Sequence, residues 1–202
     1  MSKKYNKTGG IKNMKLPFQM DLTGKVAVVT GAGGVLCSVM AQALAMCGAK
    51  VALLDRTKEY ALEKAELIVK EGYIAKGYEA NVLDKDSLKV AHEAILKDFG
   101  PCDILINGAG GNNPMATTDK EYFEMGDIDE DTKSFFDLEQ SGVEFVFNLN
   151  FIGTLLPTQE FAKDMVEKEH ASILNIASMN AYTPLTKIPA YSGAKAAITN
   201  FT

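Results

Sequence analysis

A tyrosine and a lysine near residue 190 are spaced so that they could act together in proton transfer. Tyr191 and Lys195 are four residues apart, and side chains at this spacing on a helix share one face about one turn apart. Free tyrosine has a pKa of about 10 and is a poor base at neutral pH, but a nearby cation favours the phenolate and lowers that pKa. Together with Ser178, thirteen residues upstream, the pair predicts a tuned proton donor or acceptor.

The same spacing also has a simpler interpretation, a surface tyrosine beside an unrelated lysine, because short motifs are only hypotheses. The choice between the two depends on whether the rest of the chain provides elements that would hold a cofactor and position the pair.

The first part of the chain predicts such elements. Residues 25–30 form a short apolar run rich in β-branched side chains, which is typical of a buried parallel strand. The run leads into Gly31-Ala32-Gly33-Gly34, a helical stretch at 35–47 and a second apolar strand at 50–55. A glycine-rich turn alone indicates only a tight turn. A strand, glycine turn, helix and strand in succession are typical of a dinucleotide site, because the glycines admit the pyrophosphate and the helix N-terminus attracts its charge.

Asp55, at the end of the second strand, predicts which nucleotide binds. It follows the glycine turn by about 20 residues, where a carboxylate can accept hydrogen bonds from both ribose hydroxyls. The same carboxylate would repel a 2′-phosphate, so NAD is favoured over NADP. Arg56 keeps NADP open as the alternative, because a guanidinium could pair with that phosphate.

The remaining pattern predicts an α/β fold, a Rossmann-type doubly wound parallel sheet flanked by helices, because strands alternate with helices. In such sheets ligands bind at the carboxyl ends of the strands, where Gly31, Asp55, Asn107 and Ser178 all fall. The segment 108–141 lacks periodicity, and we expect either a wall of the substrate pocket or a solvated insertion. Further helices are expected at 57–71, 84–99, 143–168 with a kink at Pro157, and from Pro189 onward, and further strands at 73–80, 103–107 and 172–178.

Composition excludes several classes of protein. A net charge of −5 argues against a nucleic-acid partner, and no apolar run reaches the ~18 residues of a membrane span, so we expect a cytoplasmic protein. The three cysteines are expected to be free thiols, and neither they nor His92 and His170 suggest a metal site. Residues 1–20 predict a loose N-terminal arm, and residues 21–202 predict a single nucleotide-binding domain.

Taken together, these residues resemble the short-chain dehydrogenase/reductase family from Leu22 to the end of the sequence. Thr30-Gly31 matches the start of the family's Thr-Gly-x-x-x-Gly-x-Gly turn, although Val35 and Cys37 occupy the later glycine positions. Asn107-Gly108-Ala109-Gly110 matches the family's Asn-Asn-Ala-Gly with Gly108 in place of one Asn. Members of the family continue through two more strands, so we expect the C-terminal strands to be missing from this chain.

The resemblance implies a role for each residue of a catalytic tetrad. Tyr191 would be the general acid in reduction and the base in oxidation, and Lys195 would hold the nicotinamide ribose and lower the pKa of the phenol. Ser178 would hydrogen-bond the reacting carbonyl or alcohol, and Asn150 would hold a water that links Lys195 to solvent. The expected cofactor-binding residues are Gly31, Gly33, Gly34, Val35, Leu36, Asp55, Arg56, Asn81, Val82, Asn107, Ala109, Gly110, Tyr191 and Lys195.

Three segments (111–114, 148–158 and 178–191) resemble a narrower branch, the D-mannonate oxidoreductases (fructuronate reductases). That resemblance implies an NAD-dependent interconversion of a sugar acid and its keto form, with gluconate and 5-ketogluconate as an alternative substrate pair. Asn113 and Asn180 are the expected substrate contacts, and the family implies a homodimer or homotetramer. A non-catalytic dinucleotide sensor, and an epimerase or dehydratase that returns its hydride, are the competing interpretations.

Overall fold

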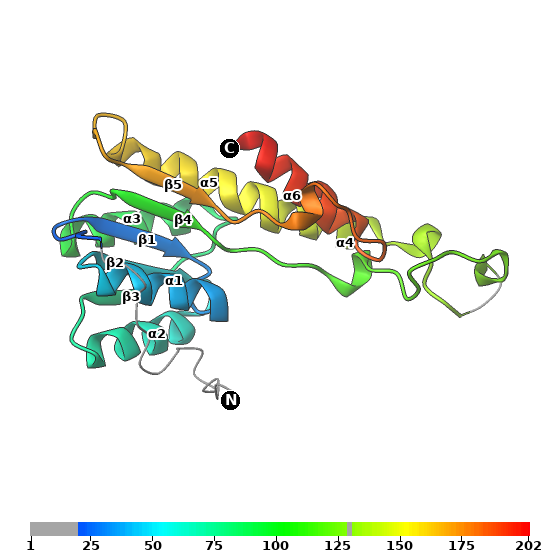
Figure 1. The fold of residues 1–202 in the computed structure, drawn as a ribbon, viewed down its shortest axis with the longest axis horizontal. Helices are drawn as coiled ribbons and strands as arrows, with labels where there is room; N and C mark the ends of the chain where they lie inside the picture. The colour runs from blue at the N-terminus through cyan, green and yellow to red at the C-terminus, as the bar shows by residue number, and fades with distance from the viewer. Residues whose placement is uncertain (1–19, 129–130) are drawn as a thin grey trace. The chain divides into compact units, whose positions relative to one another are not determined.

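The computed structural model describes residues 20–128 and 131–202, and these fold into two compact units (Figure 1). The first unit holds the described residues up to Ala109 together with Leu156–Leu174. The second unit holds the described residues of Gly110–Leu155 together with Asn175–Thr202. The expected N-terminal arm lies, except for Met20, outside the described residues.

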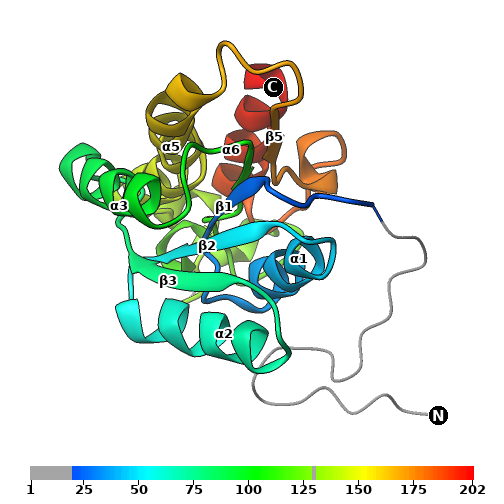
Figure 2. The same ribbon diagram turned by 90° about the vertical axis from the view of Figure 1, so that its left-hand side faces the viewer.

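A five-stranded sheet with the order β3-β2-β1-β4-β5 organises the first unit. The pairs β1–β2, β1–β4 and β2–β3 are parallel, which confirms the predicted Rossmann-type sheet. The crossover helix α1 (Val35–Met46) covers one face and α3 (Lys85–Asp98) covers the other (Figure 2). The strands are β1 (Val26–Thr30), β2 (Lys50–Asp55), β3 (Ala75–Glu79), β4 (Ile104–Asn107) and β5 (Ser172–Asn175).

The core of the first unit lies between this sheet and its helices. All five residues of β1 and the central four of β2 are buried, as expected for apolar strands covered on both faces. On the α3 side, Leu88, Ile95 and Phe161 fill the space against β1 and β4. Helix α2 (Lys58–Lys70) packs on β2 and β3 and carries an ion pair between Glu66 and Lys70, at 3.6 Å.

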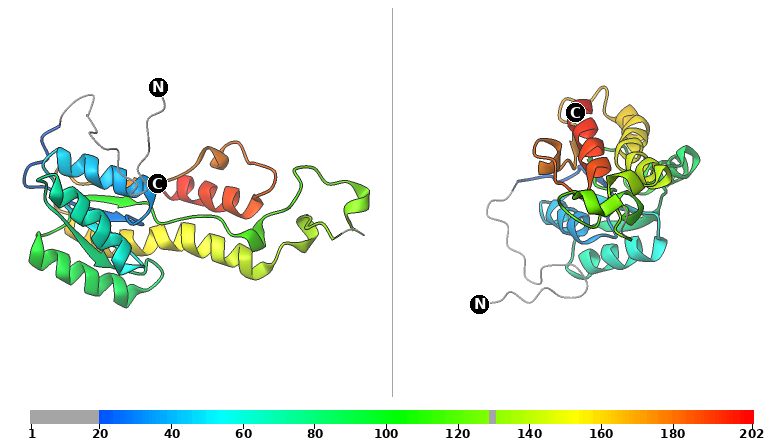
Figure 3. Two further views of the ribbon diagram at one scale, coloured as in Figure 1. Left: turned by 90° about the horizontal axis from the view of Figure 1, so that it is seen from below. Right: turned by 90° about the vertical axis from the view of Figure 1, so that its right-hand side faces the viewer.

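Helix α2 begins where expected, whereas the long helix expected at 143–168 has different bounds. Thr57 occupies the N-cap position of α2, but its side chain makes no capping hydrogen bond. The helix expected at 143–168 begins earlier as α4 (Gln140–Phe147), passes through a π-helical turn at Asn148–Ile152, and continues as α5 (Gly153–Phe161) (Figure 3). It ends in the short 3₁₀ helix η5 (Ala162–Asp164), because the residues that follow fold back to the start of β4.

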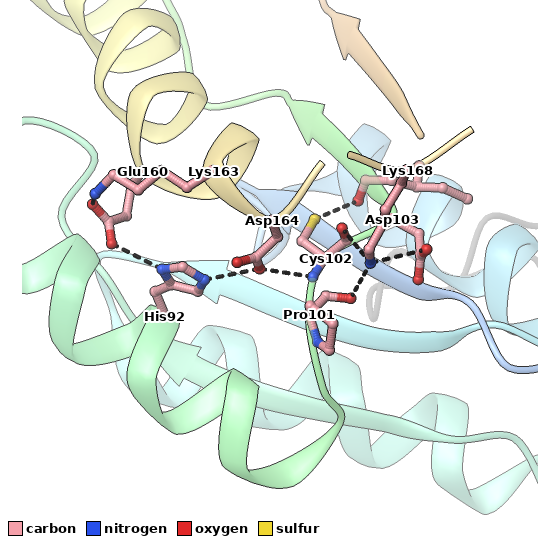
Figure 4. Close-up of polar contacts among 9 residues, drawn as sticks. His92, Pro101, Cys102, Asp103, Glu160, Lys163, Asp164 and Lys168 are labelled. Carbon is pink, nitrogen blue, oxygen red and sulfur yellow. Dashed lines mark hydrogen bonds and ion pairs between the residues drawn. The ribbon is translucent and has the colours of Figure 1, made fainter. Parts of the chain in front are cut away.

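The fold-back brings charged side chains of η5 and α5 against α3 (Figure 4). The ring nitrogens of His92 lie 2.8 Å from Glu160 Oε1 and 2.9 Å from Asp164 Oδ2. Asp164 Oδ2 also accepts a hydrogen bond from Cys102 N at 2.8 Å. Burial raises the pKa of Glu160, but hydrogen bonds from Lys163 and His92 outweigh it and hold that pKa below its usual value. His92 thus lies on a helix among charged side chains, whereas His170 lies in an exposed turn.

Asp103 ties the start of β1 to the chain that leads into β4. Its carboxylate accepts hydrogen bonds from Val26 N at 2.9 Å, Lys168 Nζ at 3.1 Å and Lys25 Nζ at 3.3 Å. Burial raises the pKa of Asp103, but these donors outweigh burial and the net pKa is lowered. The ionised form of Asp103 therefore stabilises the folded state.

The second unit has a small core of its own. Ala116, Val146, Ala190 and Ala194 are buried together, with Val143 and Tyr191 packed against them. Helix α6 (Pro189–Phe201) begins at the expected proline and packs on α4. The aperiodic segment 108–141 contributes the short 3₁₀ helices η1 (Pro114–Ala116), η2 (Met125–Ile128) and η3 (Phe135–Asp137), and η6 (Met179–Ala181) follows β5. Within the described part of the chain, no helix combines the length and the apolar character needed to cross a membrane.

The anchoring of Asp103 predicts an acid-dependent stability. We expect Asp103→Asn to lower the free energy of unfolding at pH 7 by roughly 1–3 kcal/mol, because charged hydrogen bonds at a buried site are lost. A carboxyl group with a lowered folded-state pKa stabilises the fold above its unfolded pKa of about 3.9 and loses that contribution as the pH falls further. Urea unfolding at pH 7 and pH 3 should therefore show a smaller difference between variant and wild type at pH 3. Glu66→Gln, in an exposed ion pair, is the control and should not measurably change the free energy of unfolding at either pH.

Candidate active site

The glycine turn after β1 lies against the segment that follows β4. Gly31 has a φ of 66°, a conformation that favours glycine. A Cβ on Gly31 would lie 2.9 Å from Ala109 Cα, so only glycine allows this approach. The hydroxyl of Thr30 accepts hydrogen bonds from Gly108 N at 3.0 Å and Ala109 N at 3.2 Å. This role of Thr30 was not predicted, although its place at the end of β1 could have indicated it.

Asp55 is held in one orientation at the end of β2. Its two carboxylate oxygens accept hydrogen bonds from Gly33 N at 3.1 Å and Thr57 N at 2.9 Å. A Cβ on Gly33 would lie 2.7 Å from Asp55 Oδ2, so glycine is needed for this contact as well. The adjacent α1 starts at the glycine turn with no side-chain cap and no acidic residue in its first turn. An open, uncharged helix start beside a fixed carboxylate fits a dinucleotide, with its pyrophosphate at the helix and its ribose at the acid.

The other residues expected around the nucleotide also lie at carboxyl ends of strands in the first unit. Asn81 follows β3 and its side chain accepts a hydrogen bond from Leu83 N at 3.1 Å, while Val82 is buried. Asn107 ends β4, is buried, and donates to Thr158 Oγ1 at 2.8 Å. Val35 and Leu36, in the first turn of α1, and Arg56, after β2, are exposed.

The tyrosine and the lysine share one face of α6, as their spacing predicts. Lys195 Nζ lies 5.6 Å from the centre of the Tyr191 ring. Lys195 is buried and donates a hydrogen bond to the carbonyl oxygen of Ile176 at 2.7 Å. That carbonyl, which sequence motifs do not reveal, fixes the ammonium beside the ring. Lys195 is therefore not an exposed surface side chain, as the simpler interpretation would have it.

Asn150 lies in the π-helical turn and is completely buried. Its side-chain oxygen accepts a hydrogen bond from Gly111 N at 3.2 Å. Its side-chain nitrogen donates to the carbonyl oxygens of Gly111, at 2.7 Å, and of Val146. A Cβ on Gly110 would lie 2.7 Å from Asn150 Oδ1 and 3.3 Å from Lys195 Nζ. The side chains of Asn150 and Lys195 therefore both border the space beside Gly110.

Ser178 and the two expected substrate contacts also belong to the second unit. Ser178 caps η6, and its hydroxyl accepts a hydrogen bond from Asn180 N at 3.2 Å. Asn180 is buried, and η6 packs on the helix that carries Tyr191. Asn113 caps η1 with its side-chain oxygen, which accepts from Met115 N at 2.8 Å. Because the side-chain oxygen of Asn113 is used in capping, its side-chain nitrogen is the atom that could donate a hydrogen bond to a substrate.

The fold thus divides the expected site residues by task. The first unit holds the residues expected around the nucleotide up to Ala109, and the second unit holds Gly110 and the expected proton-transfer residues. Among the residues that the structure describes, no group of three or more His, Cys, Asp or Glu side chains could hold a metal ion.

These features define a Rossmann-type α/β protein with a Tyr–Lys pair, and comparison with known proteins places it further. The family model for short chain dehydrogenases matches residues 25–202. An uncharacterized oxidoreductase of Haemophilus influenzae is 58% identical over 189 residues, covering 94% of this chain and 66% of that protein. The uncharacterized oxidoreductase UxuB of Bacillus subtilis is 48% identical over 191 residues, covering 93% and 66%.

A solved structure is similar throughout the described fold. It is a crystal structure, also of a Haemophilus protein, which is provisionally named a D-mannonate oxidoreductase and contains bound NAD. It is 59% identical, has a TM-score of 0.88, and the match covers 91% of this chain and 65% of that one. The chain belongs to the short-chain dehydrogenase family and spans about two thirds of the length of these relatives.

The space beside Gly110 generates a prediction. Gly110→Ala should lower kcat/KM by roughly 10- to 100-fold, because the new methyl group displaces Asn150 and Lys195 by a fraction of an ångström to an ångström. The neighbouring Gly111→Ala is the matched control, because its Cβ would meet nothing closer than 4.0 Å, and we expect a much smaller loss. Steady-state kinetics of the complete protein would measure both, and equal losses would show that the space at Gly110 is not critical.

Proposed function

We propose that the protein is an NAD-dependent oxidoreductase that interconverts a sugar acid and its keto form. The observation that carries the proposal is the geometry of the second unit, where a buried lysine is fixed beside Tyr191 and, together with Asn150, borders the space beside Gly110. Such a set has no purpose in a protein that only senses a dinucleotide, because sensing needs no proton transfer. The family membership and the NAD in the similar crystal structure support the same conclusion.

The first unit would hold the cofactor. Asp55 would accept hydrogen bonds from the ribose hydroxyls, and the turn from Gly31 to Gly34, with Val35 and Leu36, would offer backbone N–H groups to the pyrophosphate. Asn81 and Val82 would line the adenine, and Asn107, Ala109 and Gly110 would line the nicotinamide side. When bound, NAD supplies the hydride acceptor and NADH the hydride donor.

The second unit would handle the proton. In reduction, Tyr191 would donate its hydroxyl proton to the carbonyl oxygen of the substrate, while Ser178 would hold that oxygen by a hydrogen bond. Lys195, whose Nζ lies 5.6 Å from the centre of the Tyr191 ring, would hold the nicotinamide ribose and place a positive charge beside the reacting phenol. Asn150 would position the water through which the proton is restored, and in oxidation each transfer runs in reverse.

For the substrate, D-mannonate and D-fructuronate are the pair that we propose. The sequence segments 111–114, 148–158 and 178–191 and the provisional name of the similar crystal structure support this pair. Asn113 and Asn180 would contact the sugar acid, and the main-chain N–H of Asn180 donates a hydrogen bond to the hydroxyl of Ser178. A homodimer or homotetramer in the cytoplasm, without nucleic acid or membrane partners, completes the proposal.

Absorbance of NADH with the complete protein and a panel of keto sugar acids, including fructuronate and 5-ketogluconate, would test the function. We expect rapid oxidation of NADH with fructuronate, and a loss of at least about 10²-fold in Tyr191→Phe, which removes the proton donor. NADH binding without turnover of any keto acid would contradict the proposal and favour the sensor. Turnover of a sugar without net change in NADH would favour an epimerase or dehydratase.

The choice of cofactor gives a separate prediction. Because the Asp55 carboxylate is fixed by two backbone N–H groups, it cannot turn away from a 2′-phosphate, and the wild type should strongly prefer NADH over NADPH. In Asp55→Ser the repulsion disappears and Arg56 is available, so the ratio of kcat/KM for the two cofactors should shift toward NADPH by about tenfold or more. An unchanged ratio would mean that Asp55 does not contact the ribose.

A further inference from the structure

Two departures from the family's sequence pattern meet in the first unit. Cys37 stands at the last glycine position of the nucleotide turn, and Gly108 replaces the second asparagine of the segment after β4. A Cβ on Gly108 would overlap the sulfur of Cys37. The sulfur therefore occupies the space that any side chain at position 108 would need, and the two positions are complementary in volume.

The pair lies where the two nucleotide-binding segments touch. Cys37 is buried in the first turn of α1. Next to it, Thr30 accepts hydrogen bonds from the backbone of residues 108 and 109, and Gly31 approaches Ala109. These backbone contacts pull the segments together, whereas the sulfur sets how closely they approach on the α1 side, because close-packed groups resist both compression and voids.

We propose that Cys37 and Gly108 are paired positioning residues, which together set the spacing between the glycine turn and the 107–109 segment and thereby the affinity for the nicotinamide cofactor. The inference rests on the proposed function for its link to the cofactor. The packing part stands on the structure alone. With the sulfur removed, a Cβ at position 108 would lie 3.1 Å from the carbonyl oxygen of Thr30, a tight contact that a shift of a few tenths of an ångström relieves, and 3.6 Å from Cys37 Cβ, an ordinary contact.

A double-mutant cycle tests the pairing. Gly108→Ala should raise the dissociation constant of NADH by about tenfold or more and lower the thermal unfolding midpoint, because the methyl group and the sulfur cannot share one space. Cys37→Ala alone should have a smaller effect, since it leaves a small void. In the double variant Cys37→Ala with Gly108→Ala, the dissociation constant of NADH should return to within about threefold of that of Cys37→Ala. The unfolding midpoint should return to that of Cys37→Ala as well. Such a non-additive result would show direct coupling between the two positions.

A matched control uses another buried cysteine. Cys102 precedes β4, whereas Gly108 follows it, so Cys102→Ala should not rescue Gly108→Ala, and the two effects should add. Rescue by Cys102→Ala as well would overturn the pairing. If Gly108→Ala fails to fold, recovery of a folded protein in the Cys37→Ala double variant supports the inference, and failure of both contradicts it.

Kinetics separate positioning of the cofactor from general stability. We expect the KM for NADH to rise by about tenfold or more in Gly108→Ala while kcat at saturating NADH changes by less than about threefold, because the proton-transfer residues lie elsewhere. If wild type does not bind NADH, the proposed function fails. The unfolding midpoints of the variants would still show whether Cys37 and Gly108 are complementary in volume. If wild type binds NADH and the double variant does not recover its affinity, only the present inference fails.

Discussion

The close approach of two backbone segments, at the ends of β1 and β4, is the constraint on which the proposed nucleotide site depends. Gly31 lies against Ala109, and the hydroxyl of Thr30 bonds the backbone of both Gly108 and Ala109. Backbone can come this close only where side chains are missing, so glycines and a short hydroxyl side chain gather here. The parallel pairing of β1 with β4 brings these two ends side by side at one edge of the sheet.

The second unit solves a different physical problem, which is how to bury a lysine. Lys195 is buried, and a buried ammonium is costly unless its hydrogen bonds are satisfied. The carbonyl of Ile176 provides one acceptor, and the ring of Tyr191 lies within cation–π distance. Asn150 is buried beside it and is held by the main chain of Gly111 and Val146. Lys195 and Asn150, which we propose for proton transfer, are therefore fixed largely by main-chain groups.

The sequence allowed the parallel sheet, the fixed acid at the end of β2 and the Tyr–Lys face of α6 to be predicted, because each depends on local periodicity or spacing. Local patterns could not predict the π-helical turn at Asn148–Ile152, since an added residue within a helix leaves no signature in hydrophobic spacing. They also placed the end of this helix too late. The fold-back of Lys168 to the carbonyl oxygens of Pro101 and Cys102 is a contact between residues far apart in sequence.

The division into two units separates what all members of such a family share from what must vary. A nucleotide is the same whatever the substrate, so the close backbone contacts around Gly31 and the fixed Asp55 can be retained for many reactions. Substrate recognition by Asn113 and Asn180 would involve the second unit, where short 3₁₀ helices and capped loops replace regular packing. Loops on a fixed scaffold can change without disturbing the sheet, which is why fold and cofactor can be argued from sequence more securely than the particular sugar acid.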